Sequence, residues 1–267
     1  MKKILVNTIL FFNILCYSQN SNKKVNVIFY ESSHIYDTIN NLTKNEKLNK
    51  VFNDKFSKYK SFDKQIFDSI LKEKASKSNL VLGEKFSLNM EGIKNGTSLE
   101  FYTDLKTSKV YTKTKFNEVL YFIKNTEQIS WKILDDRKII LNRNCQKATC
   151  ELRGRNYIAW FSNEVPYSVG PWKLNGLPGA ILLAYDDKEQ VRFEAFKINF
   201  NNILKENDFF DIPTEQNLIS REDFKKVKDA VRDNPELLNK SNITIKLNTE
   251  TKPIKNKNLI NNPLELN

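Results

Sequence analysis

The feature that most constrains the fold is a long series of short β-prone runs separated by turn residues, from about residue 80 to residue 200. The runs are Phe86–Met90, then 109–114, 118–124, 129–134, 138–143, 145–152, 157–161, 180–185 and 191–200, with an earlier run at 25–30. Short strands joined by tight turns are typical of antiparallel sheets and open barrels. We therefore predict a mainly β protein of the α+β kind, an antiparallel sheet or open half-barrel with a few peripheral helices.

Four sequence signals predict where these strands turn. Asn95-Gly96 predicts a tight hairpin, with a return strand from Leu99. Asp135-Asp136, the run 153–156 and the run 186–188 are polar or glycine-containing breaks between later strands. Adjacent aspartates between strands are typical turn residues, so we do not interpret either Asp-Asp pair as a catalytic dyad.

Two regions differ from this β pattern. Residues 37–79 are polar with apolar residues at helical spacing, such as Phe52 and Phe56, and predict a helical insertion with helix near 44–76 or a partly ordered insertion. Ser220-Arg-Glu-Asp223 has the form of a capping box and predicts a helix to about Arg232. A last strand is predicted at 243–247, followed by a C-terminal tail that is loose from Thr249 up to Asn262. We expect residues 19–267 to form a single domain.

The first 18 residues have the form of a signal peptide. Lys2 and Lys3 precede a short apolar run that ends in small residues near Ser18. No later run reaches the roughly 20 apolar residues that span a bilayer, so no transmembrane segment is expected after cleavage. The sequence predicts an exported protein of the periplasm, the cell envelope or the medium. Its net charge of +11 comes from scattered lysines and not from the clustered stripe of a nucleic-acid-binding protein, so no nucleic-acid partner is expected.

Chemistry-bearing residues are few. His34 is the only histidine, and it has no cysteine or carboxylate at ligand spacing, so no metal site is predicted. The sequence contains no phosphate-binding loop, dinucleotide motif or nucleophile elbow, and no cofactor is predicted. Cys145 and Cys150 would lie about 16 Å apart in one straight strand, so a disulfide between them requires a turn. A disulfide and two small buried side chains remain the alternatives.

The segment from Arg153 to Gly179 is unusual because it combines arginine and tryptophan with glycine and proline. Leu177-Pro178-Gly179-Ala180 has the pattern of a type II turn. A stiff loop with such side chains can recognise a partner, and the candidate binding residues are Arg153, Arg155, Trp160 and Trp172. The alternative is a rigid corner that places both tryptophans in the core.

These residues carry a resemblance to a known family. Cys145-Gln-Lys-Ala148, Arg153-Gly-Arg155 and Tyr157-Ile-Ala-Trp160 lead into Gly170-Pro171-Trp172-Lys173, the run Gly176-Leu177-Pro178-Gly179 and the ending Asn262-Pro-Leu-Glu-Leu266. In these motifs the chain resembles the GLPGLI family of exported envelope proteins from Gram-negative bacteria. Ala180 departs from the leucine of the family's name, and Cys150 is atypical, so the resemblance does not support a Cys145–Cys150 bridge. The family carries no assigned activity, and the resemblance therefore indicates fold and location only.

Two classes of function remain from the sequence. The first is a non-enzymatic binding or scaffold protein that uses the 153–180 region to contact an envelope protein, peptide, glycan or lipid. The second is a carboxylate-dependent hydrolase or transferase. A periplasmic lipid carrier with an apolar groove is a further alternative. The absence of any nucleophile motif favours the binding protein.

Overall fold

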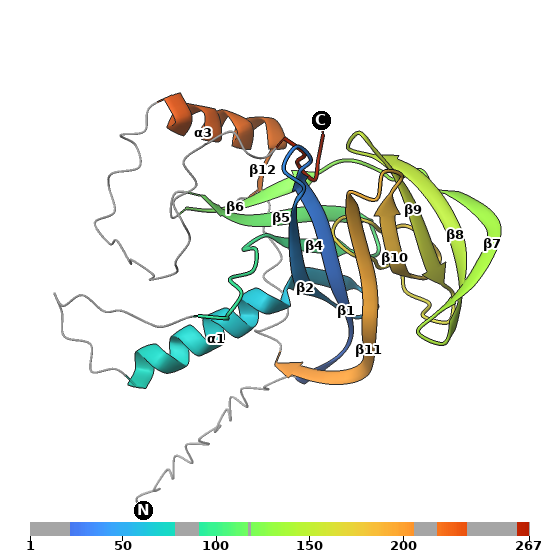
Figure 1. Ribbon diagram of the computed structural model, residues 1–267. Coiled ribbons are helices and arrows are strands. Elements are labelled where there is room, and N and C mark those ends of the chain that lie inside the picture. Colours follow the sequence, from blue (N-terminus) through green and yellow to red (C-terminus); the bar gives the residue numbers. More distant parts are fainter. Residues whose placement is uncertain (1–21, 78–90, 117–118, 206–217, 234–260, 267) are drawn as a thin grey trace, which may run out of the picture.

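The computed structural model describes residues 22–77, 91–116, 119–205, 218–233 and 261–266. These residues form a single twelve-stranded sheet and two helices (Figure 1). The elements are β1 (Asn22–Asp37), β2 (Leu42–Phe52), β3 (Phe56–Ser61), α1 (Phe62–Lys77), β4 (Glu100–Asp104), β5 (Lys109–Phe116), β6 (Val119–Asn125), β7 (Lys132–Ile140), β8 (Arg143–Leu152), β9 (Arg155–Ser162), β10 (Ala180–Asp186), β11 (Val191–Lys205), β12 (Leu218–Ile219) and α3 (Arg221–Asp233). The prediction of a mainly β protein with peripheral helices is confirmed.

The sheet consists of two runs of sequential strands joined at one long pairing. Its order is β12-β6-β5-β4-β3-β2-β1-β11-β10-β9-β8-β7, and every pair is antiparallel except β12 with β6. β1 pairs with β11 from Asn22↔Lys205 to His34↔Val191, with irregular steps near residues 26 and 29. Such bulges increase local twist, and the sheet in Figure 1 is strongly bent.

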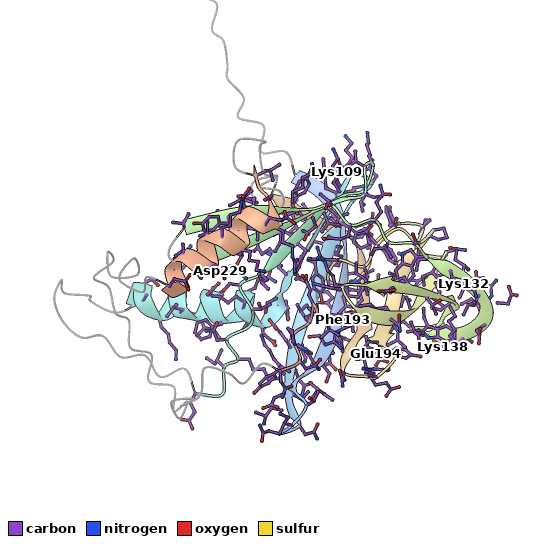
Figure 2. All side chains as sticks on the ribbon, turned by 90° about the horizontal axis from the view of Figure 1, so that it is seen from above. Lys109, Lys132, Lys138, Phe193, Glu194 and Asp229 are labelled. Atoms are coloured by element: carbon purple, nitrogen blue, oxygen red, sulfur yellow. The ribbon has the colours of Figure 1, made fainter. Side chains whose placement is uncertain are left out.

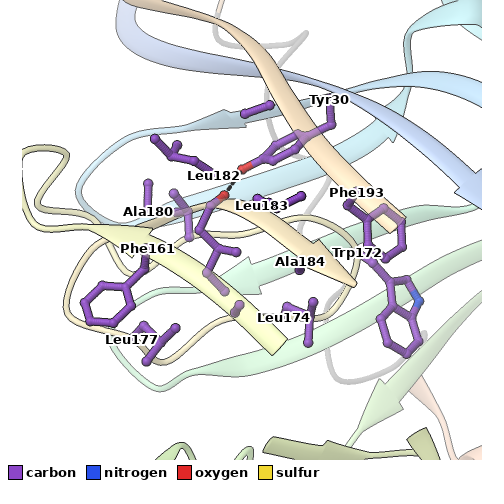
Figure 3. Close-up of a cluster of buried hydrophobic side chains, with 14 of the residues drawn as sticks. Tyr30, Phe161, Trp172, Leu174, Leu177, Ala180, Leu182, Leu183, Ala184 and Phe193 are labelled. Carbon is purple, nitrogen blue, oxygen red and sulfur yellow. Dashed lines mark hydrogen bonds between the residues drawn. The ribbon is translucent and has the colours of Figure 1, made fainter. Parts of the chain in front are cut away.

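The main core lies between the sheet and the long loop 163–179 that joins β9 to β10. Val165, Val169, Leu174 and Leu177 of this loop are almost completely buried. They pack with apolar side chains from β1–β4 and β8–β11 (Figure 3). The Tyr30 hydroxyl of β1 donates a 2.8 Å hydrogen bond to the Ile181 carbonyl of β10, shown as a dashed line in Figure 3. The loop is thus part of the core.

The predicted helical insertion is mostly wrong. β1 continues to Asp37, and β2 and β3 occupy residues 42–61, so that helix covers only residues 62–77. Phe52 and Phe56 lie on either side of a tight turn in which the Asn53 side chain accepts hydrogen bonds from the backbone N–H groups of Lys55 and Phe56 at 2.8 and 2.9 Å. A spacing of four residues occurs across such a turn as well as along a helix, which explains the misassignment. α1 has a normal N-cap, because Ser61 Oγ accepts a hydrogen bond from the Lys64 N–H at 2.9 Å.

Two predicted turns are also wrong. Asp135 and Asp136 lie inside β7, and the chain turns instead at Leu141-Asn142, with φ of 50° and 57°. Positive φ at both positions is the geometry of a type I′ hairpin, which normally selects Asn and Gly.

Asn95-Gly96 does not form a hairpin between strands, because residues 93–99 are irregular and a Cβ on Gly96 would lie 1.9 Å from Ser61 Oγ. The glycine here permits close packing against β3. The expected strand at 86–90 lies outside the described residues.

The predicted turns at 153–156 and 186–188 and the predicted cap of the C-terminal helix agree with the structure. The chain turns at 153–154, where φ is 53° and 74°, and again after β10. Ser220 and Asp223 form the predicted cap of α3: Ser220 Oγ accepts from the Asp223 N–H at 3.0 Å and contacts its carboxylate at 2.8 Å. The predicted strand at 243–247 lies outside the described residues. Neither described helix is long and apolar enough to cross a membrane.

Candidate cationic cleft

An open cleft of about 660 Å³ lies between α3, the sheet and the C-terminal segment. Its floor is formed by side chains of β4, β5 and β6, among them Phe101 and Ile123. α3 provides one wall, and its Phe224 is anchored by ring contacts with Phe116 and Tyr121 at centroid distances of 6.0 and 5.1 Å. Trp172 and Lys173 of the long loop and residues 264–265 of the C-terminal segment complete its lining.

The cleft carries more positive than negative side chains. Its cations are Arg153, Lys173, Arg221, Lys225 and Lys228, and its acids are Glu222, Asp229 and Glu265. Figure 2 shows the α3 wall with Asp229 labelled, far from the β7 lysines at the opposite end of the molecule. The site therefore has a net positive charge.

Glu265 is the central acid of this cleft. Its carboxylate accepts from Lys173 Nζ at 2.5 Å and is also paired with Arg221. Burial alone would raise the pKa of Glu265, but Lys173 and Arg221 outweigh burial and lower the pKa below its ordinary value. Glu265 is therefore held as an anion.

The cations of the cleft repel one another. Burial lowers the pKa of Lys173, and the positive charges of Arg221 and Arg153 lower it further, against the effect of Glu265. Burial, followed by repulsion from Arg221, likewise lowers the pKa of Arg153, although Arg153 is paired with Glu127. An added anion would relieve this repulsion.

The four predicted binding residues do not form one exposed face. Trp172 and Trp160 are buried, with 2% and 8% of their surfaces exposed, and Arg155 is buried at 3%. Arg153 is ion-paired with Glu127. The prediction of a shared exposed patch is wrong, because Trp172 of the loop and Trp160 of β9 both point into the core. Arg153 and Trp172 nevertheless contribute atoms to the cleft.

The glycine–proline motif has a packing role different from the one predicted. Gly179 does not have positive φ, so the type II turn is wrong. A Cβ on Gly179 would lie 2.2 Å from the Ser162 carbonyl oxygen, and one on Gly170 would lie 2.5 Å from the Leu174 carbonyl oxygen. Both glycines permit close approach of backbones, and Gly176, with φ of 95°, is the position that requires left-handed geometry. Pro171, Leu177 and Pro178 lie in the same loop, with Leu177 fully buried.

The two cysteines are free and buried in β8. Cys145 and Cys150 are five residues apart in one strand and therefore point to opposite faces of the sheet. Burial raises the pKa of Cys145 to about 11 and that of Cys150 to about 12. The sequence left a disulfide and two small buried side chains as alternatives, and the structure has the two buried side chains.

The most informative pair that sequence reasoning missed is Arg155 with Asp186. The two side chains are 2% and 1% exposed, and Arg155 Nη1 donates to Asp186 Oδ2 at 2.6 Å. Asp186 was expected to be a turn residue, and its other oxygen does accept the Val191 N–H at 2.8 Å. No local signal distinguishes this aspartate from its neighbour Asp187, which is exposed.

Residues 261–266 are docked against the sheet, whereas the predicted loose stretch from Thr249 lies outside the described residues. Asn262 is 5% exposed, and its side chain accepts from Arg155 at 2.6 Å and donates to the Ile35 carbonyl at 2.5 Å. His34 Nε2 donates to the Asn262 carbonyl at 2.9 Å. Among the residues that the structure describes, there is no cluster of three or more metal-ligating side chains, and His34 serves here in backbone recognition.

The fold and the cleft define the class: a mainly antiparallel β protein with a cationic cleft beneath a C-terminal helix. No protein-family model matches the sequence, and neither does any curated protein.

Among solved structures, the chain resembles PNGF-II in space group P21, at 13% identity and a TM-score of 0.52 over 76% of this chain and 33% of that one. It also resembles PNGF-II in space group C2, at 14% identity and a TM-score of 0.50 over 79% and 33%. The chain thus spans about a third of PNGF-II, and the likeness is one of fold alone.

Proposed function

We propose that this chain is an exported cell-envelope protein of the GLPGLI type that binds an anionic partner, without catalysis, in the cleft beneath α3. The observation that carries the proposal is the excess of cations on an apolar floor, five basic side chains against three acidic ones. The volume of about 660 Å³ falls within the usual range for ligand sites. Export rests on the form of residues 1–18 and on the resemblance of the motifs.

Electrostatics favours an anion over a cation or a neutral sugar. The charges of Arg221 and Arg153 help to lower the pKa of Lys173, and the charge of Arg221 helps to lower that of Arg153, so a carboxylate or phosphate placed among these cations would relieve their repulsion. Among the partner classes expected from the sequence, the cleft fits envelope proteins, peptides, glycans or lipids that carry such a group. The cations make it a poor channel for an acyl chain, which argues against the lipid-carrier alternative.

The carboxylates favour binding over hydrolysis. A general acid needs a raised pKa, whereas Glu265 has a lowered one because Lys173 and Arg221 hold its charge. The other described carboxyl groups whose pKa departs from the ordinary value are Asp37, Glu100 and Asp223, and theirs are lowered as well. Such groups are suited to hold structure together.

Charge reversal on the exposed face of α3 tests the proposal. The Lys225→Glu/Lys228→Glu variant changes the cleft. Lys132→Glu/Lys138→Glu changes the net charge equally on β7, at the other end of the molecule from α3 in Figure 2. Each protein would be immobilised and exposed to envelope extract, and captured molecules identified by mass spectrometry. We expect the first variant to lose anionic ligands that the wild type and the second variant retain, with capture falling as salt rises. Equal capture by all three proteins would refute the proposal.

A further inference from the structure

Arg155 lies in a buried socket in which side chains of the sheet hold one edge of its guanidinium. β9 carries Arg155 and β10 carries Asp186, and these strands pair directly, with Asp186 opposite Tyr157. Asp186 fixes one edge of the guanidinium at 2.6 Å, and Gln190 Oε1 accepts from the same nitrogen at 3.3 Å. The remaining donors of Arg155 point away from these partners.

Those remaining donors are all used by one short segment. Arg155 Nη2 donates to Asn262 Oδ1 at 2.6 Å and to the Pro263 carbonyl at 2.7 Å. Arg155 Nε donates to the Leu264 carbonyl at 3.2 Å. A buried arginine whose N–H groups lack acceptors strongly destabilises the folded protein. The socket therefore needs a segment that supplies these acceptors.

The Asn262 side chain is recognised specifically and not merely covered. Its amide donates to the Ile35 carbonyl while its oxygen accepts from Arg155. Its backbone N–H donates to the Tyr36 carbonyl at 3.1 Å, and its own carbonyl accepts from His34. An aspartate would lose the donor to Ile35, and a leucine would lose both side-chain contacts.

A second set of contacts binds Glu265, the acidic residue three positions after Asn262. Glu265 pairs with Lys173 and with Arg221, and Leu266 N–H donates to the Arg153 carbonyl at 3.0 Å. The socket therefore binds four groups in a fixed order along the segment. They are an Asn side chain, the backbone carbonyls of the next two residues, and an acidic side chain. Tyr36 and Arg155, which bind the same Asn, are more than 100 residues apart in the chain, so the socket belongs to the tertiary fold.

We propose that the Arg155 socket is a peptide-binding site for segments of the form Asn-Pro-x-acidic, and that residues 261–266 occupy it as an intramolecular ligand that can be replaced in trans. The chain between α3 and this segment, residues 234–260, makes docking an intramolecular event with an effective concentration set by its length. The docked segment shares the Glu265 contacts with Lys173 and Arg221 with the cleft. Its test measures binding of a defined peptide and not capture of anions, so failure of this proposal and failure of the proposed function can be distinguished.

The test uses the full mature chain with Asn262→Ala and Glu265→Ala, which frees the socket. A labelled peptide of residues 259–267 is added, and binding is followed by fluorescence anisotropy. We expect saturable binding that weakens at least about tenfold when the peptide carries the Asn262→Ala substitution, the loss typical of a hydrogen bond to a charged group. The wild-type chain should bind the peptide more weakly than the variant, since its socket is filled.

A second measurement covers the case in which the variant does not fold. A protease site replaces residues 244–250 of the otherwise wild-type chain, which is cut after folding. The released C-terminal fragment should remain bound and should exchange with the labelled wild-type peptide, but not with the peptide that carries Asn262→Ala. Equal binding of both peptides, or loss of the fragment with no rebinding, would overturn the proposal.

Discussion

Lys50 is a buried cation in β2, and its replacement by methionine tests how this core handles charge. The residue is 1% exposed and pairs in register with Tyr59 of β3, whose ring centroid lies 5.8 Å from the ammonium. No carboxylate of the described residues forms an ion pair with Lys50. Burial lowers the pKa of Lys50 from 10.5 to about 7. The charged form is therefore disfavoured in the folded protein.

The sign of the pH dependence follows from this depressed pKa. Between pH 7 and 10.5 the unfolded chain holds the Lys50 proton and the folded chain does not, so the free energy of unfolding rises with pH over that window. Below pH 7 both states are protonated, and the burial cost is fully present. At about 1.36 kcal/mol per pH unit, the contribution from pH 6 to pH 9.5 is on the order of 3 kcal/mol.

Lys50→Met should remove this dependence while filling a similar volume. We expect the variant to be more stable than the wild type at pH 6, with the advantage shrinking by about 3 kcal/mol at pH 9.5. Urea unfolding followed by tryptophan fluorescence measures both values. Tyr59, whose ring lies beside Lys50, and Tyr30, which packs against Tyr59, have pKa values raised by burial and do not titrate in this range in the folded protein.

The matched control is Lys47→Met, in the same strand but with half of its side chain exposed. It should leave the pH profile of the wild type unchanged. If the difference in unfolding free energy between Lys50→Met and the wild type were the same at pH 6 and pH 9.5, Lys50 would not be neutralised by burial and the reasoning would be refuted.

Three further predictions follow from the structure. Gly179→Ala should destabilise the fold by about 1–3 kcal/mol, because its Cβ would overlap the Ser162 carbonyl; an unchanged thermal midpoint would contradict the close approach. Asp186→Ala should cost about 3–5 kcal/mol by leaving Arg155 buried without its carboxylate, whereas the control Asp187→Ala should change little, as urea unfolding of both variants will show. Mass spectrometry of protein from the envelope should find the mature N-terminus near Ser18, and an intact Met1 would exclude cleavage.

Local sequence signals were sufficient wherever the structure depends on neighbouring residues. The cap of α3 forms as predicted because Ser220 and Asp223 satisfy one another's groups within a single turn. The hairpin at 153–154 forms because Gly154 adopts positive φ at low cost. The same logic failed at Leu141-Asn142, where pairing of β7 with β8 imposes positive φ on a leucine.

The candidate site was only partly visible in the sequence. The motifs around Arg153 and Trp172 correctly marked residues near the cleft, but they were interpreted as an exposed face. The side chains of Arg221 and Glu265 had no motif that linked them to Lys173. They meet there because α3 and the end of the chain pack against the same side of the sheet (Figure 1).

The sequence by itself determined the β-rich class, the α3 helix and the turns at 153–154 and after β10, because alternation, caps and glycine act over a few residues. Only the tertiary structure decided that residues 42–61 are strands, that the Gly-Pro loop is core, and that Asn262 meets Arg155. In each case the structure is decided by the burial of side chains against partners that are far away in the sequence. Burial lowers the pKa of Lys50, whereas Lys173 and Arg221 outweigh burial and lower that of Glu265. Both effects depend on neighbours that local sequence does not identify.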